Sequence, residues 1–410
     1  MILKLIKATT AASAAAWSAI WTFPSILLSA FIIAWAAEAA QFLISQGLAL
    51  AILAWLQTLP EFAVEAVIAW QAGKDPTQTH LAIANFTGSL RLLVGLGWPM
   101  IYFVAAAFGW RRDRRFISVQ LDAEHSVEVF GLFLPIAYFT FIWWKGTLSV
   151  WDALPLTASY VLYLFILWKI PPRDDEEEAL EDLGVVPRAV LKMPPKRRNA
   201  AIWILFLAGG AILYFAAHPF LNSMLAIATT LGVSNFVFVQ WVAPFLSEFP
   251  EKLSAFYWAR KVRTANVALM NMVSSNINQW SILSAMIPIL FVISAGEIRP
   301  LVFDAHQRAE ILLTILQSFL GFLLLLNLQL KLHEALILFV FWLVQFAVPS
   351  WRGPMIYVYL AWCIIELVRL EIEELVADSF LAGDRARSRR LTLVATVSAH
   401  QVGLVLGGTL

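Results

Sequence analysis

The sequence predicts an all-α polytopic membrane protein, on the basis of its composition, its long apolar stretches and the placement of its charges. Of the 410 residues, 60% are hydrophobic and only 14% are charged. A soluble domain carries about 25% charged residues, so too few polar side chains are present here to cover a surface in contact with water. The charges form short blocks between long apolar stretches, as loops between membrane spans do.

Eleven apolar stretches are long enough to cross a bilayer, which takes roughly 20 residues as a helix. They lie at about 20–45, 47–72, 79–109, 127–146, 151–170, 200–223, 231–259, 265–295, 309–330, 332–349 and 355–372. We expect ten of them to form a core of two inverted five-helix repeats, and the eleventh to be a C-terminal addition. The predicted parts are an N-terminal half (1–170), a cytoplasmic linker (171–199), a C-terminal half (200–350) and a last helix with a tail (351–410).

Basic clusters predict how the chain is oriented in the membrane. They lie at 111–115, 196–198, 260–263 and 385–390. With eleven spans all four fall on one side, which the positive-inside rule makes cytoplasmic, so we expect the N-terminus outside and the C-terminus inside. The sequence shows no cleavable signal peptide, and we expect a prokaryotic inner membrane. The acidic run at 174–178 is typical of a solvated linker, with a regulatory cation sensor as the alternative.

Composition also limits the partners. A net charge of +1 provides no broad basic face for nucleic acid. A single cysteine, Cys363, excludes an intramolecular disulfide and a cysteine-based metal cluster. His125 and Glu124 lie in a loop without the spacing of a metal site. We therefore expect lipid and small inorganic cations as the partners, with no cofactor and no prediction of the oligomeric state.

Two helices that proline interrupts begin similar strings, one in each half. The first string is Leu59-Pro60-Glu61, then Ala84-Asn85-Phe86-Thr87-Gly88-Ser89; the second is Phe249-Pro250-Glu251, then Met270-Asn271-Met272-Val273-Ser274-Ser275. Five predicted spans separate the copies, and an odd number inverts the second copy relative to the first. Inverted repeats with broken helices at corresponding positions indicate a substrate site near the middle of the bilayer. A packing kink is the alternative explanation for each proline taken alone.

The residues of these strings suit a cation. An ionised carboxylate in the bilayer interior costs at least roughly 2.5–3.5 kcal/mol, so it persists where water or a cation compensates it. Hard cations take oxygen ligands. We expect Glu61 and Glu251 to be the charged metal ligands, with a buried structural network as the alternative. Asn85 and Asn271 would add neutral oxygens, unless they only bond neighbouring helices; backbone carbonyls near Thr58 and Ser247 would complete the shell.

The strings resemble the two repeats of the sodium/calcium exchangers of the calcium:cation antiporter superfamily, which carry G-T-S-L-P-E and G-N-x-x-G-S-N. The resemblance covers about residues 20–350. It implies a ten-helix inverted-repeat core, alternating access, and exchange of Ca²⁺ against Na⁺ or H⁺. By the same resemblance, Glu61, Glu251, Asn85 and Asn271 line the cation cavity.

Departures from the family pattern add further candidates. The opening glycines are replaced by Leu56 and by Phe245 or Leu246, Glu248 stands where the family has serine, and Gln279 stands where many members have aspartate. Glu248 is a further candidate ligand, and Ser89, Ser275, Glu65 and Gln279 are candidates for the surrounding shell.

Arg91 at membrane depth needs an acidic partner, with Glu61, Glu65 and Glu248 as the candidates. We hypothesise that its guanidinium stands where relatives bind a monovalent cation. The alternative is a structural ion pair away from the pathway.

The sequence thus predicts a secondary cation antiporter and not an enzyme. It contains no G-x-x-x-x-G-K-[ST] phosphate-binding loop, so we expect ion gradients to drive transport. No metalloprotease or serine-hydrolase motif is present, which disfavours an intramembrane enzyme. The alternative is a transporter-derived protein that binds or senses a ligand without exchange, favoured by Arg91 and the lost motif glycines.

Overall fold

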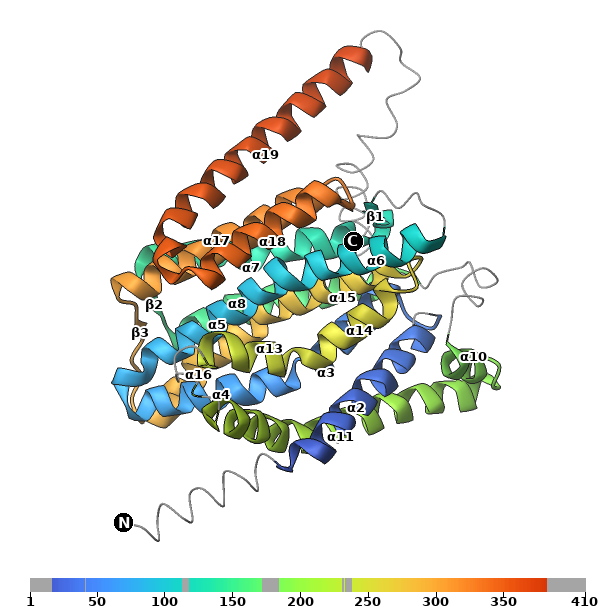
Figure 1. The fold of residues 1–410 in the computed structure, drawn as a ribbon, viewed down its shortest axis with the longest axis horizontal. Helices are drawn as coiled ribbons and strands as arrows, with labels where there is room; N and C mark the ends of the chain where they lie inside the picture. Colours follow the sequence, from blue (N-terminus) through green and yellow to red (C-terminus); the bar gives the residue numbers. More distant parts are fainter. Residues whose placement is uncertain are drawn as a thin grey trace, which may run out of the picture.

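The computed structural model describes residues 17–40, 42–112, 118–171, 184–230, 232 and 238–381. This part of the chain is mostly helical, and its long helices run side by side as a bundle (Figure 1). The acidic run at 174–178 and the basic tail at 385–390 lie outside the described residues.

Helices occupy every predicted apolar segment. In the first half they are α2 (Ala19–Ala40), α3 (Gln46–Gln57), α4 (Leu59–Lys74), α5 (Thr79–Leu92), the π-helix η2 (Leu93–Gly97), α6 (Trp98–Arg112), α7 (Ser126–Lys145) and α8 (Ala153–Lys169). After the short α10 (Val185–Leu191) follow α11 (Pro195–Thr230), the π-helix η5 (Phe238–Val242), α13 (Ala243–Ser247), α14 (Phe249–Ala259), α15 (Ala265–Asn278), the π-helix η6 (Gln279–Leu283) and α16 (Ser284–Ala295). The last helices are α17 (Ala305–Leu325), α18 (Leu332–Ala347) and α19 (Arg352–Leu381).

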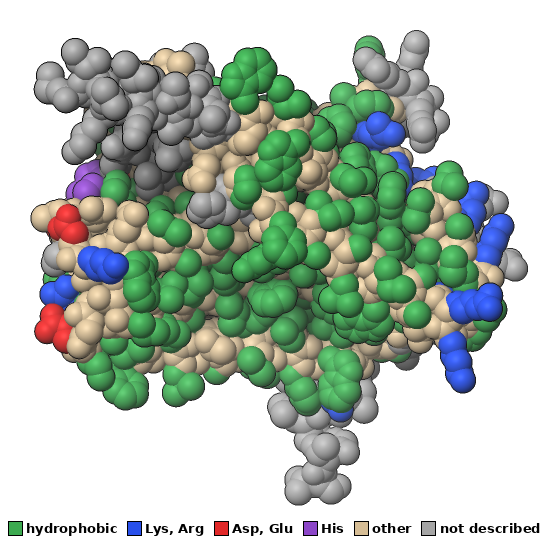
Figure 2. All heavy atoms as spheres, turned by 90° about the horizontal axis from the view of Figure 1, so that it is seen from below, with side chains coloured by type: hydrophobic (Ala, Val, Ile, Leu, Met, Phe, Trp, Pro, Cys, Tyr) green, Lys and Arg blue, Asp and Glu red, His purple; other side chains and the backbone are tan. Residues whose placement is uncertain are grey.

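The length and apolarity of these helices suit a membrane. Within the described ranges, seven helices could cross a bilayer, and the number rises to nine when each bent helix pair counts as one span. One bent pair is α3 with α4, at an angle of 47°, and the other is α18 with α19, at 118°. Hydrophobic side chains cover the middle of the face in Figure 2, while Lys and Arg gather at one end. The chain is an integral membrane protein.

The central helices of the two halves have the same build. Helix α5 has 14 residues and leads through a five-residue π-helix into α6, and α15 has 14 residues and leads through a five-residue π-helix into α16. Superposing these elements pairs Asn85 with Asn271 and Ser89 with Ser275. The sequence motifs predicted this pairing. They did not predict the π-helices, which are frequent at functional sites because they locally widen a helix.

Small antiparallel strand pairs, which an all-α prediction lacks, join the two halves. Strand β1 (Ser118–Gln120) pairs with β4 (Gln329–Lys331), and β2 (Thr147–Leu148) pairs with β3 (Leu301–Val302). β1 follows α6 and β3 follows α16, while β2 follows α7 and β4 follows α17. Exchanging the two halves therefore turns one strand pair into the other, as expected of two repeats.

Helices α2 and α11 pack against each other along one edge of the bundle (Figure 1). The Ser29 hydroxyl donates to the carbonyl oxygen of Gly209 at 3.1 Å. A Cβ at Gly209 would lie 2.5 Å from Cγ1 of Ile33, so glycine is what allows this close approach. Helix α11 begins at Pro195, earlier than predicted, and α19 extends beyond the predicted end at 372.

Candidate cation site

The two helix breaks have matching backbone geometry. Thr58, between α3 and α4, has φ −84° and ψ −1°, and Glu248, between α13 and α14, has φ −86° and ψ 2°. A proline is the second residue after each break, and it cannot donate to the helix ladder. The carbonyl of Thr58 still accepts the amide of Phe62 at 3.0 Å, and that of Glu248 accepts the amide of Lys252 at 3.1 Å. The chain is therefore bent at these points but hardly unwound.

This geometry bears on the predicted roles of Thr58 and Ser247. The Thr58 carbonyl stays in the helix ladder, and its hydroxyl accepts a hydrogen bond from Nδ2 of Asn278 at 2.7 Å. The Ser247 hydroxyl donates to the carbonyl of Pro244 at 3.2 Å. The carbonyl of Thr58 is therefore not unwound, while a ligand role for the carbonyls near Ser247 stays a prediction.

Four glutamates meet where the two breaks face each other. Glu61 interacts electrostatically with Glu248, Glu251 and Glu65. All four side chains are buried, none with more than 1% of its surface exposed. The two Pro-Glu motifs therefore lie at one buried site, as the inverted-repeat prediction required.

Donors from α5 and η6 reach two of these carboxylates. The hydroxyl of Ser89 lies in hydrogen-bond contact with both Glu61 and Glu248. Nε2 of Gln279 donates to Oε2 of Glu61 at 2.7 Å and lies 3.5 Å from Oε1 of Glu248. Ser89 and Gln279 thus contact carboxyl groups of both halves and bridge them.

Glu251 has fewer donors. The hydroxyl of Ser275 is the neighbouring hydrogen-bonding group, beside Glu248, and neither carboxylate oxygen of Glu251 meets strict hydrogen-bond geometry with any group of the described chain. An ionised carboxylate is a pure acceptor. A fully buried one with so few donors is suited to bind a cation or a proton.

The amide side chains of this site also have oxygens without a hydrogen-bond donor. Nδ2 of Asn85 donates to Oε2 of Glu65 at 2.6 Å, and Nδ2 of Asn271 donates to Oε1 of Gln57 at 3.2 Å. The amide oxygens of Asn85, Asn271 and Gln279 accept no hydrogen bond from any described residue. In each of these side chains the amide nitrogen donates to another protein group, while the amide oxygen remains available as an acceptor. A cluster rich in acceptors suits a hard cation.

Lys252 is a site residue that the sequence analysis did not identify. Its ammonium is buried and forms an ion pair with Glu248. The signal in the sequence was the spacing of four residues, which places two side chains on one helix face. The ion pair neutralises one carboxylate and leaves Glu61, Glu65 and Glu251 for other cations or protons.

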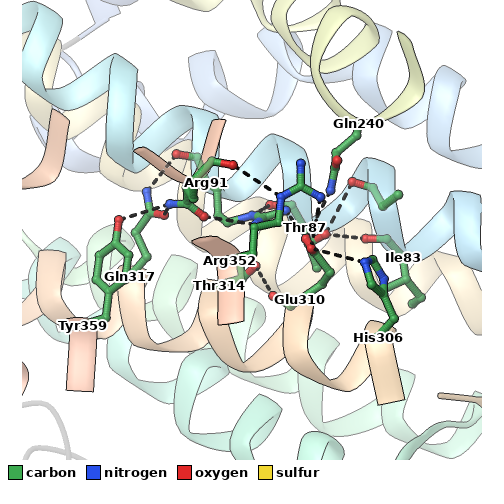
Figure 3. Close-up of polar contacts among 12 residues, drawn as sticks. Ile83, Thr87, Arg91, Gln240, His306, Glu310, Thr314, Gln317, Arg352 and Tyr359 are labelled. Carbon is green, nitrogen blue, oxygen red and sulfur yellow. Dashed lines mark hydrogen bonds and ion pairs between the residues drawn. The ribbon is translucent and has the colours of Figure 1, made fainter. Parts of the chain in front are cut away.

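The partner of Arg91 differs from the prediction. Its guanidinium forms an ion pair with Glu310 of α17, and Nε donates to the Thr87 carbonyl at 3.0 Å (Figure 3). Nη1 donates to Oε1 of Gln345 at 3.0 Å, and Arg352 binds the other oxygen of Glu310 at 3.2 Å. None of the three predicted glutamates is its ion-pair partner. Arg91 therefore ties α5 to α17, α18 and α19, which corrects its predicted partners, while the hypothesis that it stands in place of a monovalent cation stays a prediction.

Gly88, within the first motif, permits η5 to pass directly over α5. A Cβ at this position would lie 2.0 Å from the backbone oxygen of Gln240. Because backbone cannot move aside as a flexible side chain can, we expect Gly88→Ala to cost about 1–3 kcal/mol, the usual range for overpacking. A thermal unfolding midpoint in detergent would measure the effect.

Gly210→Ala provides the matched control, since a Cβ there would meet its nearest neighbour, Leu56, at an ordinary 3.4 Å. It should leave the midpoint unchanged or raise it slightly, because alanine favours a helix. Equal midpoints for both variants would contradict the close approach at Gly88.

The fold and the site together define a class. The protein is a helical inverted-repeat membrane protein with broken helices, whose facing breaks enclose buried acidic side chains. This is the arrangement in which secondary transporters bind ions.

Comparison with protein-family models identifies the family. The model for the sodium/calcium exchanger protein family matches residues 13–169 and 201–351. The chain belongs to this family, as its motifs suggested. The comparison with curated proteins found no match.

Solved structures agree with this family assignment. The crystal structure of the H⁺/Ca²⁺ exchanger CAX has 31% sequence identity to this chain and a TM-score of 0.75. The match covers 93% of this chain and 92% of the CAX chain. A structure of the sodium-calcium exchanger NCX_Mj has 16% sequence identity and a TM-score of 0.61. This match covers 82% of this chain and 99% of the NCX_Mj chain. At that lower identity the likeness shows a shared fold.

Proposed function

We propose that this protein exchanges Ca²⁺ for protons at the buried site between the two helix breaks. Membership of the exchanger family makes it a cation antiporter, and the coupling ion and the ligands are the parts that we propose. The observation that carries the proposal is the buried Glu251, whose carboxylate oxygens meet strict hydrogen-bond geometry with no described group and which interacts with Glu61 of the other half.

The number of protons available at Ser89 favours H⁺ over Na⁺ as the counter-ion. A serine hydroxyl has one proton to donate, yet Ser89 contacts the carboxyl groups of both Glu61 and Glu248. Only one of these contacts can use the serine proton, and a proton on a carboxyl group would complete the other. The arrangement therefore suits a site that carries protons when Ca²⁺ is absent. The 31% identity to an H⁺/Ca²⁺ exchanger points the same way.

The proposed exchange follows from competition for the same oxygens. Ca²⁺ would take carboxylate oxygens of Glu61 and Glu251 and the free amide oxygens of Asn85 and Asn271, since it prefers six to eight oxygen ligands. Protons on the carboxyl groups would remove the negative charge that holds the ion. Alternating access would come from movement of the gating helices, at about 20–72 and 200–259, against the rest of the bundle. Ion gradients drive this transport in our proposal, without a catalytic step or cofactor.

We further propose that the protein lies in a prokaryotic inner membrane with its N-terminus outside and its C-terminus in the cytoplasm. The basic clusters support this orientation through the positive-inside rule. The two halves, at about 1–170 and 200–350, would then be the two repeats, joined by a cytoplasmic linker.

Uptake of ⁴⁵Ca²⁺ into proteoliposomes tests the coupling ion. With an acidic interior we expect uptake that a protonophore abolishes, and with an imposed Na⁺ gradient at equal pH we expect none above empty vesicles. Addition of external Ca²⁺ should also alkalinise the lumen, as reported by a trapped pH dye. Uptake driven by the Na⁺ gradient and insensitive to pH would overturn proton coupling, and Ca²⁺ binding without any flux would favour a sensor.

A further inference from the structure

A second cluster of candidate ligands lies outside the acidic site, in the connection between α6 and α7. One ligand atom each from Asp122, Glu124 and His125 lies within 4.8 Å of the others. Asp122 and Glu124 are partly exposed, so an ion could reach them from water. The spacing of these residues matches no metal motif, and it is the short helical turn η3 (Ala123–His125) that brings them together.

His125 provides the observation that points to a ligand. Its ring is fully buried, and its Nδ1 lies 3.3 Å from Oε1 of the buried Glu128. Because an ionised carboxylate only accepts, Nδ1 carries the proton and a neutral imidazole leaves its lone pair on Nε2. Nε2 has no hydrogen-bond partner in the described chain and faces Oδ2 of Asp122 at 4.0 Å.

This arrangement has the outer shell that metal-binding histidines use. A ligating histidine almost always donates its other ring N–H to a carboxylate or carbonyl, which fixes its tautomer and orientation. Glu128 fills that role here, and its second oxygen has no hydrogen-bond partner among described residues. Gly47 makes room for it, since a Cβ at Gly47 would lie 2.4 Å from Oε1 of Glu128.

We propose that Asp122, Glu124 and His125 bind a divalent transition-metal ion such as Zn²⁺, with Glu128 as the positioning residue for His125. Imidazole nitrogen and carboxylate oxygen are both zinc ligands, and water can fill the remaining position. Ca²⁺ and Mg²⁺ prefer sites made of oxygen alone, so they should compete poorly. Nδ2 of Asn266 donates to Oδ2 of Asp122 at 3.1 Å, which helps to orient this carboxylate.

Isothermal titration of the full chain with ZnCl₂ tests this site separately from transport. The titration would use the Glu61→Gln/Glu251→Gln variant, which lacks the acidic ligands of the proposed exchange site. We expect one equivalent of Zn²⁺ to bind, its binding to persist in excess Ca²⁺, and His125→Asn to abolish it. Exposed His80 supplies the matched control, because His80→Asn removes a histidine at the start of α5 and should leave the titration unchanged.

Two milder variants keep the proposal testable if His125→Asn does not fold. Asp122→Asn keeps the shape of a ligand while removing its charge, and should weaken binding. Gly47→Ala touches no ligand but forces the Glu128 side chain to shift, and loss of such an outer-shell partner weakens metal binding about 10–100-fold. Zn²⁺ titrations that are the same in the parent, Asp122→Asn and Gly47→Ala proteins would overturn the site, as would a parent that binds no Zn²⁺.

Discussion

Calcium uptake is expected to fall by more than 100-fold when Glu61 and Glu251 are both replaced by glutamine. Each substitution keeps the shape of the side chain and removes a charged oxygen from a fully buried position. Removing one partner of a buried charge pair costs about 3–5 kcal/mol, and each 1.4 kcal/mol is about tenfold in binding. The proteoliposome assay with ⁴⁵Ca²⁺ and an acidic interior measures the loss.

Glu366→Gln is the matched control for this variant. Glu366 is also a buried membrane glutamate, but it lies on α19 and pairs with Arg369 at 3.2 Å. Its neutralisation should leave calcium uptake within about twofold of the parent, since the 0.4 kcal/mol that twofold represents is small beside a lost ligand. If the double variant transported as fast as Glu366→Gln, the two Pro-Glu motifs would not form the transport site.

The sequence predicted the central residues of the site because the motifs that contain them occur twice. Glu61 and Glu251 each follow a proline in a broken helix, and Asn85 and Asn271 each begin the next motif. An odd number of spans between the copies was enough to require that they meet. The structure brings these residues to one buried cluster, while their role as cation ligands stays a proposal.

Contacts between residues that are far apart in the sequence could not be predicted in the same way. Arg91 and Glu310 are 219 residues apart, and no motif connects them, so the nearby glutamates were better candidates by sequence alone. The π-helices have no recognisable composition. Lys252 and Glu248 did carry a readable four-residue spacing, but the repeat pattern favoured the glutamates over the lysine that neutralises one of them.

The observed partners of Arg91 form a buried polar network that connects several helices. Glu310 lies between two guanidinium groups, those of Arg91 and Arg352, and Gln345 connects Arg91 to Tyr359 of α19. These contacts anchor the added C-terminal helix to α5, the helix that carries Asn85. The network therefore belongs to the framework that holds α5 in place.

Glu310→Gln is accordingly expected to lower the free energy of unfolding by about 3–5 kcal/mol, the cost of leaving a buried charge without its partner. Arg91 is fully buried, so its guanidinium would lose its counter-charge where water cannot replace it. Unfolding of the purified protein in detergent, followed by tryptophan fluorescence against denaturant, measures the change. His306→Gln is the control, because His306 lies 3.9 Å from the same carboxylate and is mostly exposed.

Combining the substitution with Arg91→Met separates a structural ion pair from a cation substitute. Removing both charges with apolar volume retained should recover much of the lost stability, since the fully buried arginine is gone and the remaining Arg352 is partly exposed. Proton-coupled Ca²⁺ uptake per folded molecule should then match the parent, with no new dependence on Na⁺. A double variant as unstable as Glu310→Gln would contradict the pairing. A double variant that gained Na⁺-driven uptake would show instead that the arginine charge had been occupying the place of a monovalent cation.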